Sequence, residues 1–154
     1  MDSFHFKEGS FELLDFCNDL WELFIINQTR NAGEMSDGVK EYIHSLKNGG
    51  LLDKTKNGQL YVQLVYVNNT EKPIAFCITS LSKDLIGEVE TLFVLEKYQG
   101  NKLGGKLFNK ALSWLEEKEA IEQKLTVAIG NESVFDFYSR YNFFPGYTTL
   151  FRAM

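Results

Sequence analysis

The segment 98-YQGNKLGGKLF-108 places three glycines directly before a run with helical periodicity. Apolar residues of that run, which ends near Lys118, recur three or four positions apart, at Leu103, Leu107, Ala111, Trp114 and Leu115. This spacing predicts an amphipathic helix. A helix N-terminus exposes N–H groups that lack intrahelical partners and carries a partial positive charge. The segment therefore predicts either a phosphate-binding loop or a helix start where small residues permit close packing.

Positions 100–106 also match the pattern G-x-x-x-x-G-K of a nucleotide triphosphate loop. Such a loop needs Ser or Thr after its lysine to hold magnesium, but Leu107 stands there. It also begins where a buried strand ends, whereas residues 95–99 separate the first glycine from the preceding strand-like segment. We therefore expect no triphosphate site.

Three segments upstream are rich in β-branched and aromatic residues and are separated by short turns. They lie at 59–67, 74–81 and 85–94. This pattern is typical of consecutive strands that pair through tight connections. It predicts an antiparallel meander that ends just before the glycine-rich segment.

Helices and further strands flank this meander. Ser10 is a suitable N-cap for a helix that ends near Ile26, before a loop over 27–37, and Glu12 lies in the first turn of that helix. The other predicted elements are an edge strand at 4–6, a helix from Asp37 to Leu46, a strand at 124–129, a short helix at 132–141 and a last strand at 147–153. This order predicts an α/β fold with a mixed, mostly antiparallel central sheet and helices on both faces. A length of 154 residues suits a single domain over residues 1–154.

Composition and charge argue against several classes of protein. A net charge of -5 and a pI near 5.1 disfavour nucleic-acid binding, which requires a basic face. No apolar run approaches the ~20 residues of a membrane helix, and residues 1–10 lack the features of a signal peptide. Cys17 and Cys77 lie in apolar runs, so we expect buried free thiols and a cytoplasmic location. No spacing typical of metal ligands is present, so we expect no metal site.

The glycine-rich segment resembles the Q/R-x-x-G-x-G/A loop of the GNAT superfamily of N-acetyltransferases. Gln99 and Gly104 match the outer positions of this loop, and Lys102 stands where the family has its middle glycine. Lys102 can still offer its N–H to a ligand there if its φ is negative. The segment therefore departs from the family at the position where the backbone approaches the pyrophosphate.

A second motif lies at the family's distance downstream, after an intervening strand-like segment. The family's Asn, Tyr and Gly-Phe positions are occupied here by Asn131, Tyr138 and Asn142-Phe143. Asn tolerates left-handed backbone better than most residues, so the replacement of glycine at position 142 is mild. The resemblance covers residues 60–154, whereas the first 58 residues match in helix order only. It implies the acyl-CoA N-acyltransferase (GNAT) fold.

The resemblance implies acetyl-CoA as cofactor, with its pyrophosphate on the glycine-rich loop. The loop residues in question are Gln99, Gly100, Asn101, Lys102, Leu103, Gly104 and Gly105. In the family the sheet splays near the position of Phe93 to Leu95, the pantetheine lies in that gap, and the N–H at Val94 donates to the thioester oxygen. Asn131 would hold the pantetheine or cap the following helix.

The same resemblance suggests the catalytic groups. Strand alternation predicts Glu88 and Glu90 on one face with Leu92 and Val94. In several family members a base carboxylate lies six residues before the position of Val94, which is Glu88 here, and Glu90 is the close second. Like charges on one face can raise one pKa toward the range of a base. The alternative interpretation is that both are solvent-facing residues. Tyr138 is the expected acid for the leaving thiolate, with an aromatic core residue as the alternative interpretation.

The implied function is transfer of an acetyl group from acetyl-CoA to a primary amine of a small molecule or peptide, by direct attack. The alternative is a non-catalytic acyl-CoA sensor or interaction domain on the same fold. We expect the acceptor site near the first two helices, the loop at 28–37 with Glu34 and Asp37, and the final strand. Edge strands in this fold often pair between copies, so a homodimer is also expected. The amine acceptor and the preferred acyl chain remain open at this stage.

Overall fold

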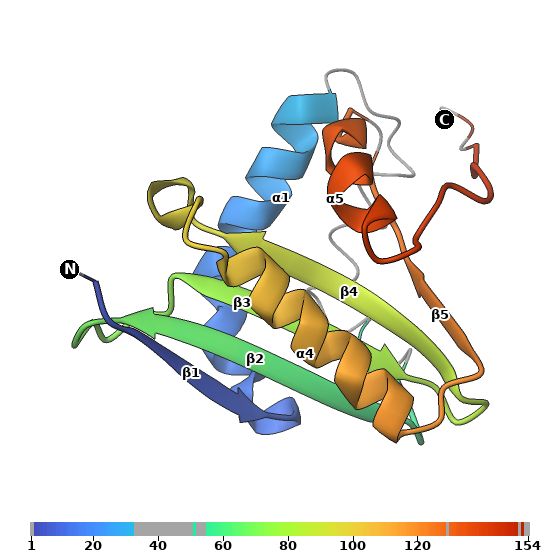
Figure 1. The fold of residues 1–154 in the computed structure, drawn as a ribbon, viewed down its shortest axis with the longest axis horizontal. Coiled ribbons are helices and arrows are strands. Elements are labelled where there is room, and N and C mark those ends of the chain that lie inside the picture. Colours follow the sequence, from blue (N-terminus) through green and yellow to red (C-terminus); the bar gives the residue numbers. More distant parts are fainter. Residues whose placement is uncertain (1, 33–50, 52–54, 129, 151, 153–154) are drawn as a thin grey trace.

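A five-stranded sheet organises the chain. The computed structural model describes residues 2–32, 51, 55–128, 130–150 and 152. The strands lie in the order β1-β2-β3-β4-β5 (Figure 1), with bounds Phe4–Gly9, Gln59–Val67, Ala75–Leu81, Ile86–Val94 and Glu122–Leu125. The first four are antiparallel neighbours, and β5 runs parallel to β4. The predicted antiparallel meander is therefore confirmed.

Helices cover both faces of this sheet, as predicted. The chain forms η1, α1, η3, α4, η4 and α5, with bounds Phe11–Cys17, Asn18–Ala32, Glu96–Tyr98, Leu103–Glu117, Glu132–Val134 and Phe135–Ser139. In Figure 1, α4 crosses one face while α1 lies on the other. None of the helices within the described ranges is long and apolar enough to cross a bilayer.

Two apolar cores result from strand alternation. Phe76 and Ile78 of β3 pack on η1 and α1, whereas the intervening Ala75 and Cys77 pack on α4. Phe108 centres the α4-side core, where four aromatic rings lie with centroids 4.8–5.8 Å from its own. Aromatic burial of this kind supplies a large share of core stability. Cys17 and Cys77 are buried free thiols, which confirms that prediction.

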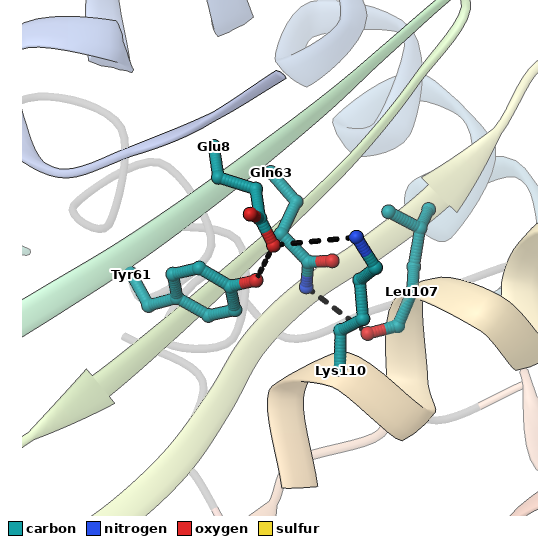
Figure 2. Close-up of polar contacts among 5 residues, drawn as sticks. All are labelled: Glu8, Tyr61, Gln63, Leu107 and Lys110. Atoms are coloured by element: carbon teal, nitrogen blue, oxygen red, sulfur yellow. Dashed lines mark hydrogen bonds and ion pairs between the residues drawn. The ribbon is translucent and has the colours of Figure 1, made fainter. Parts of the chain in front are cut away.

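Polar contacts from β1 and β2 hold α4 against the sheet (Figure 2). The Gln63 amide donates a 3.0 Å hydrogen bond from Nε2 to the carbonyl of Leu107. Glu8 accepts from the Tyr61 hydroxyl and lies 3.4 Å from Lys110 Nζ. These contacts restrain the rotation of α4 against the sheet. The N-terminus of α4 lies near the end of β4 (Figure 1).

Several predicted details at the N-terminal half are wrong. The first helix starts with a 3₁₀ segment, and it continues to Ala32 rather than ending near Ile26. The Ser10 hydroxyl does not cap it, because that group donates instead to the carbonyl of Leu60 at 2.7 Å. The predicted helix from Asp37 to Leu46 lies outside the described residues, as do Glu34 and Asp37.

The C-terminal strands also differ from prediction. The predicted strand at 124–129 is realised as β5, two residues earlier and shorter. Residues 147–150 and 152 form no strand, and the side chains of Tyr147 and Leu150 are almost fully exposed. Strand propensity requires a paired neighbour, and the described residues supply none for this segment.

Candidate active site

The sheet opens between β4 and β5. These strands pair only through Ile86 to Val89. From Glu90 onward, none of the described residues pairs with β4 on the edge that faces away from β3. The opening therefore starts earlier than the Phe93 to Leu95 expected from the resemblance. It forms a narrow cleft that brings Glu90 and Tyr138 together with Asn131. Phe24 and Gln28 of α1 and the end of β5 complete the lining of the cleft.

A β-bulge controls which side chains of β4 face the cleft. Ile78 pairs with Thr91 but the next residue, Thr79, pairs with Val89, so Glu90 is the extra residue. A bulge interrupts strand alternation and re-aims the side chains beside it. Glu90 consequently points to the α1 face, where it accepts a 2.6 Å hydrogen bond from the hydroxyl of Ser80.

Because of the bulge, the predicted grouping of four β4 side chains on one face is correct for two of them and wrong for the other two. Glu88 lies opposite Ser80 in the register, so Glu88 and Glu90 share the α1 face as expected. Leu92 and Val94 pack instead in the α4-side core. The prediction failed for this pair because it assumed unbroken alternation from residue 88 to residue 94. Phe93 consequently directs its ring to the α1 side, against Phe24 and Phe76.

Both carboxylates are buried, with 5% of Glu88 and 8% of Glu90 exposed. The solvent-facing interpretation is therefore excluded for both. Their surroundings differ: Glu88 lies where β4 still pairs with β5, 4.0 Å from Lys124 Nζ. Only Glu90 is among the residues that line the cleft. Glu90 is thus the carboxylate placed to meet a ligand there.

Tyr138 lines the cleft from α5. Its ring packs against those of Phe108 and Phe137, with centroids 5.2 Å away in each case. Burial, with a smaller contribution from Cys77, raises the pKa of Tyr138 to about 12. The hydroxyl is therefore fully protonated at neutral pH and can act as a hydrogen-bond donor.

The open edge of β4 presents backbone donors. The N–H of Leu95 points to β3, where it donates to the carbonyl of Ile74 at 3.0 Å. Successive N–H groups of a strand point to opposite edges, so that of Val94 is directed to the open side. Gln99 closes this end of the strand by donating a 3.0 Å hydrogen bond from Nε2 to the Val94 carbonyl.

The glycine-rich loop turns through two left-handed residues, Gly100 with a φ of 88° and Lys102 with a φ of 61°. The requirement of a negative φ at Lys102 is therefore not met, and this conformation costs a lysine roughly 1–2 kcal/mol. Lys102 occupies the N-cap of α4 in this conformation. The helix begins at the next residue, Leu103.

The start of α4 is open to a ligand. Within the described part of the chain, no acceptor is found for the N–H groups of Leu103, Gly104 and Gly105. A Cβ built on Gly104 would meet nothing within 4 Å. Close packing thus does not require this glycine, which disfavours the packing interpretation at Gly104. Free donors, a helix dipole and open space together fit a pyrophosphate.

Asn131 is buried but does not cap the helix that follows, so the capping interpretation is wrong. Its Nδ2 donates to the carbonyls of Ala128 at 3.2 Å and Gln28 at 3.4 Å. It therefore holds the end of α1 against the loop after β5, at the rim of the cleft.

Sequence reasoning missed two buried hydroxyl residues, Ser80 beside Glu90 and Thr91 in the cleft lining. Polar residues within otherwise apolar strands were the available signal. The apolar pattern of a strand predicts its buried face but assigns no role to the polar residues within it. Thr91 Oγ1 is buried, and no hydrogen-bond partner for it is found among the described residues.

Solved structures with similar folds include acetyltransferases. A GCN5-related N-acetyltransferase from Ralstonia eutropha JMP134 matches at 15% identity and a TM-score of 0.65, over 99% of both chains. An aminoglycoside N-acetyltransferase in complex with CoA matches at 12% identity and a TM-score of 0.63, over 100% of this chain and 96% of that chain. Ribosomal-protein-alanine N-acetyltransferase from Brucella melitensis biovar Abortus 2308 matches at 12% identity and a TM-score of 0.61, over 99% of this chain and 100% of that chain. Identities this low show a shared fold only. No curated protein matches the sequence.

The sequence itself gives the family assignment. Residues 15–143 match the profile of the Acetyltransferase (GNAT) family. This range spans the sheet from β2 to β5, the glycine-rich loop and the segment with Asn131 and Tyr138. The chain therefore belongs to the Acetyltransferase (GNAT) family.

Proposed function

We propose that the protein transfers an acetyl group from acetyl-CoA to a primary amine of a small molecule or peptide by direct attack. The observation that carries this proposal is the cleft in which Glu90 and Tyr138 meet, beside the open edge of β4. A carboxylate and a protonated phenol in one cleft provide a proton acceptor and a proton donor. Family membership supports an acyltransferase, and the geometry supports an amine as acceptor.

The loop and strand edge fit CoA. Its pyrophosphate would lie on the N–H groups of Leu103, Gly104 and Gly105, where open space is available. The pantetheine arm would follow the open edge of β4 toward Glu90. Val94 would bind the thioester oxygen through its N–H, which favours charge on that oxygen in the transition state. Bound acetyl-CoA supplies the activated thioester, and the protein supplies position and proton transfer.

Glu90 acts on the acceptor. A primary amine is mostly protonated at neutral pH and cannot attack as an ammonium ion. The Glu90 carboxylate takes one proton, so the N–H bond breaks, an O–H bond forms on Glu90 and the nitrogen lone pair becomes available. Glu90 then passes this proton to solvent, which restores the carboxylate for the next turnover.

Tyr138 acts on the leaving thiolate. A free thiol has a pKa of ~8.5, whereas burial raises the pKa of Tyr138 to about 12. Complete proton transfer from the phenol to the thiolate is therefore uphill by roughly 5 kcal/mol. Tyr138 consequently stabilises the departing sulfur by donating a hydrogen bond, and the second proton lost by the amine nitrogen ends on the thiol.

The second candidate, a non-catalytic acyl-CoA sensor, needs only the loop and the strand edge. It gives no reason for a buried carboxylate to face the cleft, since a desolvated carboxylate is costly. The placement of Glu90 in the lining therefore favours the enzyme. A cytoplasmic location and a homodimer remain predictions, the second of which light scattering tests directly.

The test is turnover. The protein is mixed with acetyl-CoA and a panel of primary amines that includes a polyamine, an aminoglycoside and a peptide with a free N-terminus. Release of the CoA thiol is followed with a thiol reagent, and acetylated products are identified by mass spectrometry. We expect thiol release that depends on one class of amine. Acetyl-CoA binding without turnover of any amine would instead favour the sensor.

A further inference from the structure

We propose that Ser80 is a positioning residue for Glu90, and that it holds this carboxylate in its charged, proton-accepting form. The inference rests on the proposed function, in which Glu90 takes a proton from the acceptor amine. Ser80 lies on β3 and is absent from the described residues that line the cleft. Its effect would therefore be exerted through Glu90 alone.

The contact itself is the first argument. The Ser80 hydroxyl donates to Glu90 Oε2 over 2.6 Å. Distances this short are typical of a hydrogen bond between a hydroxyl and an ionised carboxylate. Only 4% of Ser80 and 8% of Glu90 is exposed, so water competes little for this contact. A donor in such surroundings favours the charged form of the acid it contacts.

The bulge is the second argument. Glu90 is the extra residue of β4, so cross-strand pairing does not fix its direction. Ser80 pairs with Glu88 in the register and reaches Glu90 diagonally. It thereby fixes one oxygen of the one carboxylate that lines the cleft. This hydrogen bond therefore ties the Glu90 side chain to β3.

Other titratable groups lie near Glu90. Glu88 lies two residues earlier on the same strand, and Tyr138 lines the cleft from α5. Lys124 of β5 reaches Glu88 at 4.0 Å. A carboxylate at Glu88 opposes ionisation of Glu90, and the hydrogen bond donated by Ser80 counters this effect by stabilising the charged form of Glu90. Ser80 keeps its own proton throughout the reaction, because Glu90 alone accepts the proton of the amine.

The experiment removes and restores the donor. Ser80→Ala and Ser80→Cys delete or weaken it, and Ser80→Thr retains a hydroxyl. The matched control is Thr79→Val, which removes a neighbouring buried hydroxyl that faces the other side of β3. For each variant we would measure the pH dependence of kcat/KM and the KM for acetyl-CoA. Carbon-13 NMR of the side-chain carboxyls would follow the titration of Glu90, whose signal is identified by its loss in Glu90→Gln.

We expect Ser80→Ala to move the acidic limb of kcat/KM and the Glu90 titration midpoint upward by about one pH unit. Below that midpoint kcat should fall by up to about tenfold, whereas well above it kcat should match the wild type, and the KM for acetyl-CoA should be unchanged throughout. Ser80→Cys should move both in the same direction by less, Ser80→Thr should restore both, and Thr79→Val should move neither. If Ser80→Ala does not fold, the Ser80→Cys comparison decides.

The inference is overturned if the midpoint stays in place in a folded Ser80→Ala or Ser80→Cys protein. It is also overturned if activity falls equally at all pH values and in step with the loss of stability, as in Thr79→Val. If the wild type acetylates no amine but Ser80→Ala still raises the Glu90 titration midpoint, the proposed function is refuted and the effect of Ser80 on Glu90 stands.

Discussion

The side chain of Gln99 donates a hydrogen bond from Nε2 to the carbonyl oxygen of Val94, 3.0 Å away. This contact joins the glycine-rich loop to the last residue of β4. Val94 is also the residue whose N–H points to the open edge of the sheet. The loop proposed to bind the pyrophosphate and the strand end proposed to bind the thioester are therefore linked through one side chain, which restrains their separation.

Gln99→Ala should weaken acetyl-CoA binding by about fivefold, because one hydrogen bond of about 1 kcal/mol that orders the loop is lost. Stability should change little, since the contact is exposed. Calorimetric titration with acetyl-CoA checks the affinity. Gln59→Ala, at the exposed start of β2, is the matched control. Equal affinities for Gln99→Ala and the wild type would show that the loop is ordered by its backbone alone.

Gly104→Ala should separate stability from binding. The added methyl group meets no protein atom within 4 Å and lies inside α4, so helix propensity should raise the free energy of unfolding by up to about 1 kcal/mol. The same methyl group occupies the space proposed for the pyrophosphate, so affinity for acetyl-CoA should fall. Urea unfolding and calorimetry measure the two effects. Gly146→Ala, also in open space, should leave affinity unchanged.

Tyr138→Phe should lower kcat by about 10- to 100-fold, because the leaving thiolate loses its hydrogen-bond donor. The KM for acetyl-CoA should stay nearly constant, since the ring that packs on Phe108 is retained. Steady-state kinetics measure both quantities. Tyr141→Phe is the control, because Tyr141 also packs on Phe108 but is absent from the lining of the cleft. Equal losses in the two variants would mean that the effect is one of packing.

Stability should fall at alkaline pH. Burial raises the pKa of the Cys17 and Cys77 thiols to about 12, so they stay protonated in the folded protein while the unfolded chain ionises from about pH 9 upward. The stabilisation is complete below that value and is lost as pH rises toward 12. Each thiol contributes a slope of up to about 1.4 kcal/mol per pH unit.

Urea unfolding between about pH 8 and about pH 11 measures this slope. The double variant Cys17→Ala and Cys77→Ala should be less stable at neutral pH, because it leaves cavities. Its free energy of unfolding should nevertheless depend less steeply on alkaline pH. An identical slope in the variant would assign the effect to other groups, among them Tyr138, whose raised pKa acts from about pH 10.

Periodic features of the sequence predicted the fold well. The apolar spacing from Leu103 to Leu115 and the β-branched runs of β2, β3 and β4 correspond to elements that bury one helical face or alternate strand faces. These patterns reflect local geometry, so one sequence suffices to read them. The segment at 147–153 shows the limit, because its strand-like composition gained no partner.

The site was predicted in composition but not in geometry. Motif spacing selected Asn131, Tyr138 and, as the base, Glu88 ahead of Glu90. Glu90, Asn131 and Tyr138 line the cleft, whereas Glu88 is absent from its lining. The bulge at Glu90 depends on how β3 and β4 pair, and no local pattern encodes it. The left-handed backbone of Lys102 could not be predicted for a related reason, since a lysine adopts that conformation only when the surrounding structure imposes it.

The most direct test is calorimetric titration with acetyl-CoA of the wild type and of Gly104→Asp, with ATP and magnesium as the ligand control. Asp at this position suits the positive end of α4, so the fold should persist, but its charge repels a pyrophosphate. The account predicts micromolar binding of acetyl-CoA to the wild type, loss of that binding in the variant, and no binding of ATP. Absence of acetyl-CoA binding to the wild type, or equal binding to Gly104→Asp, would contradict it.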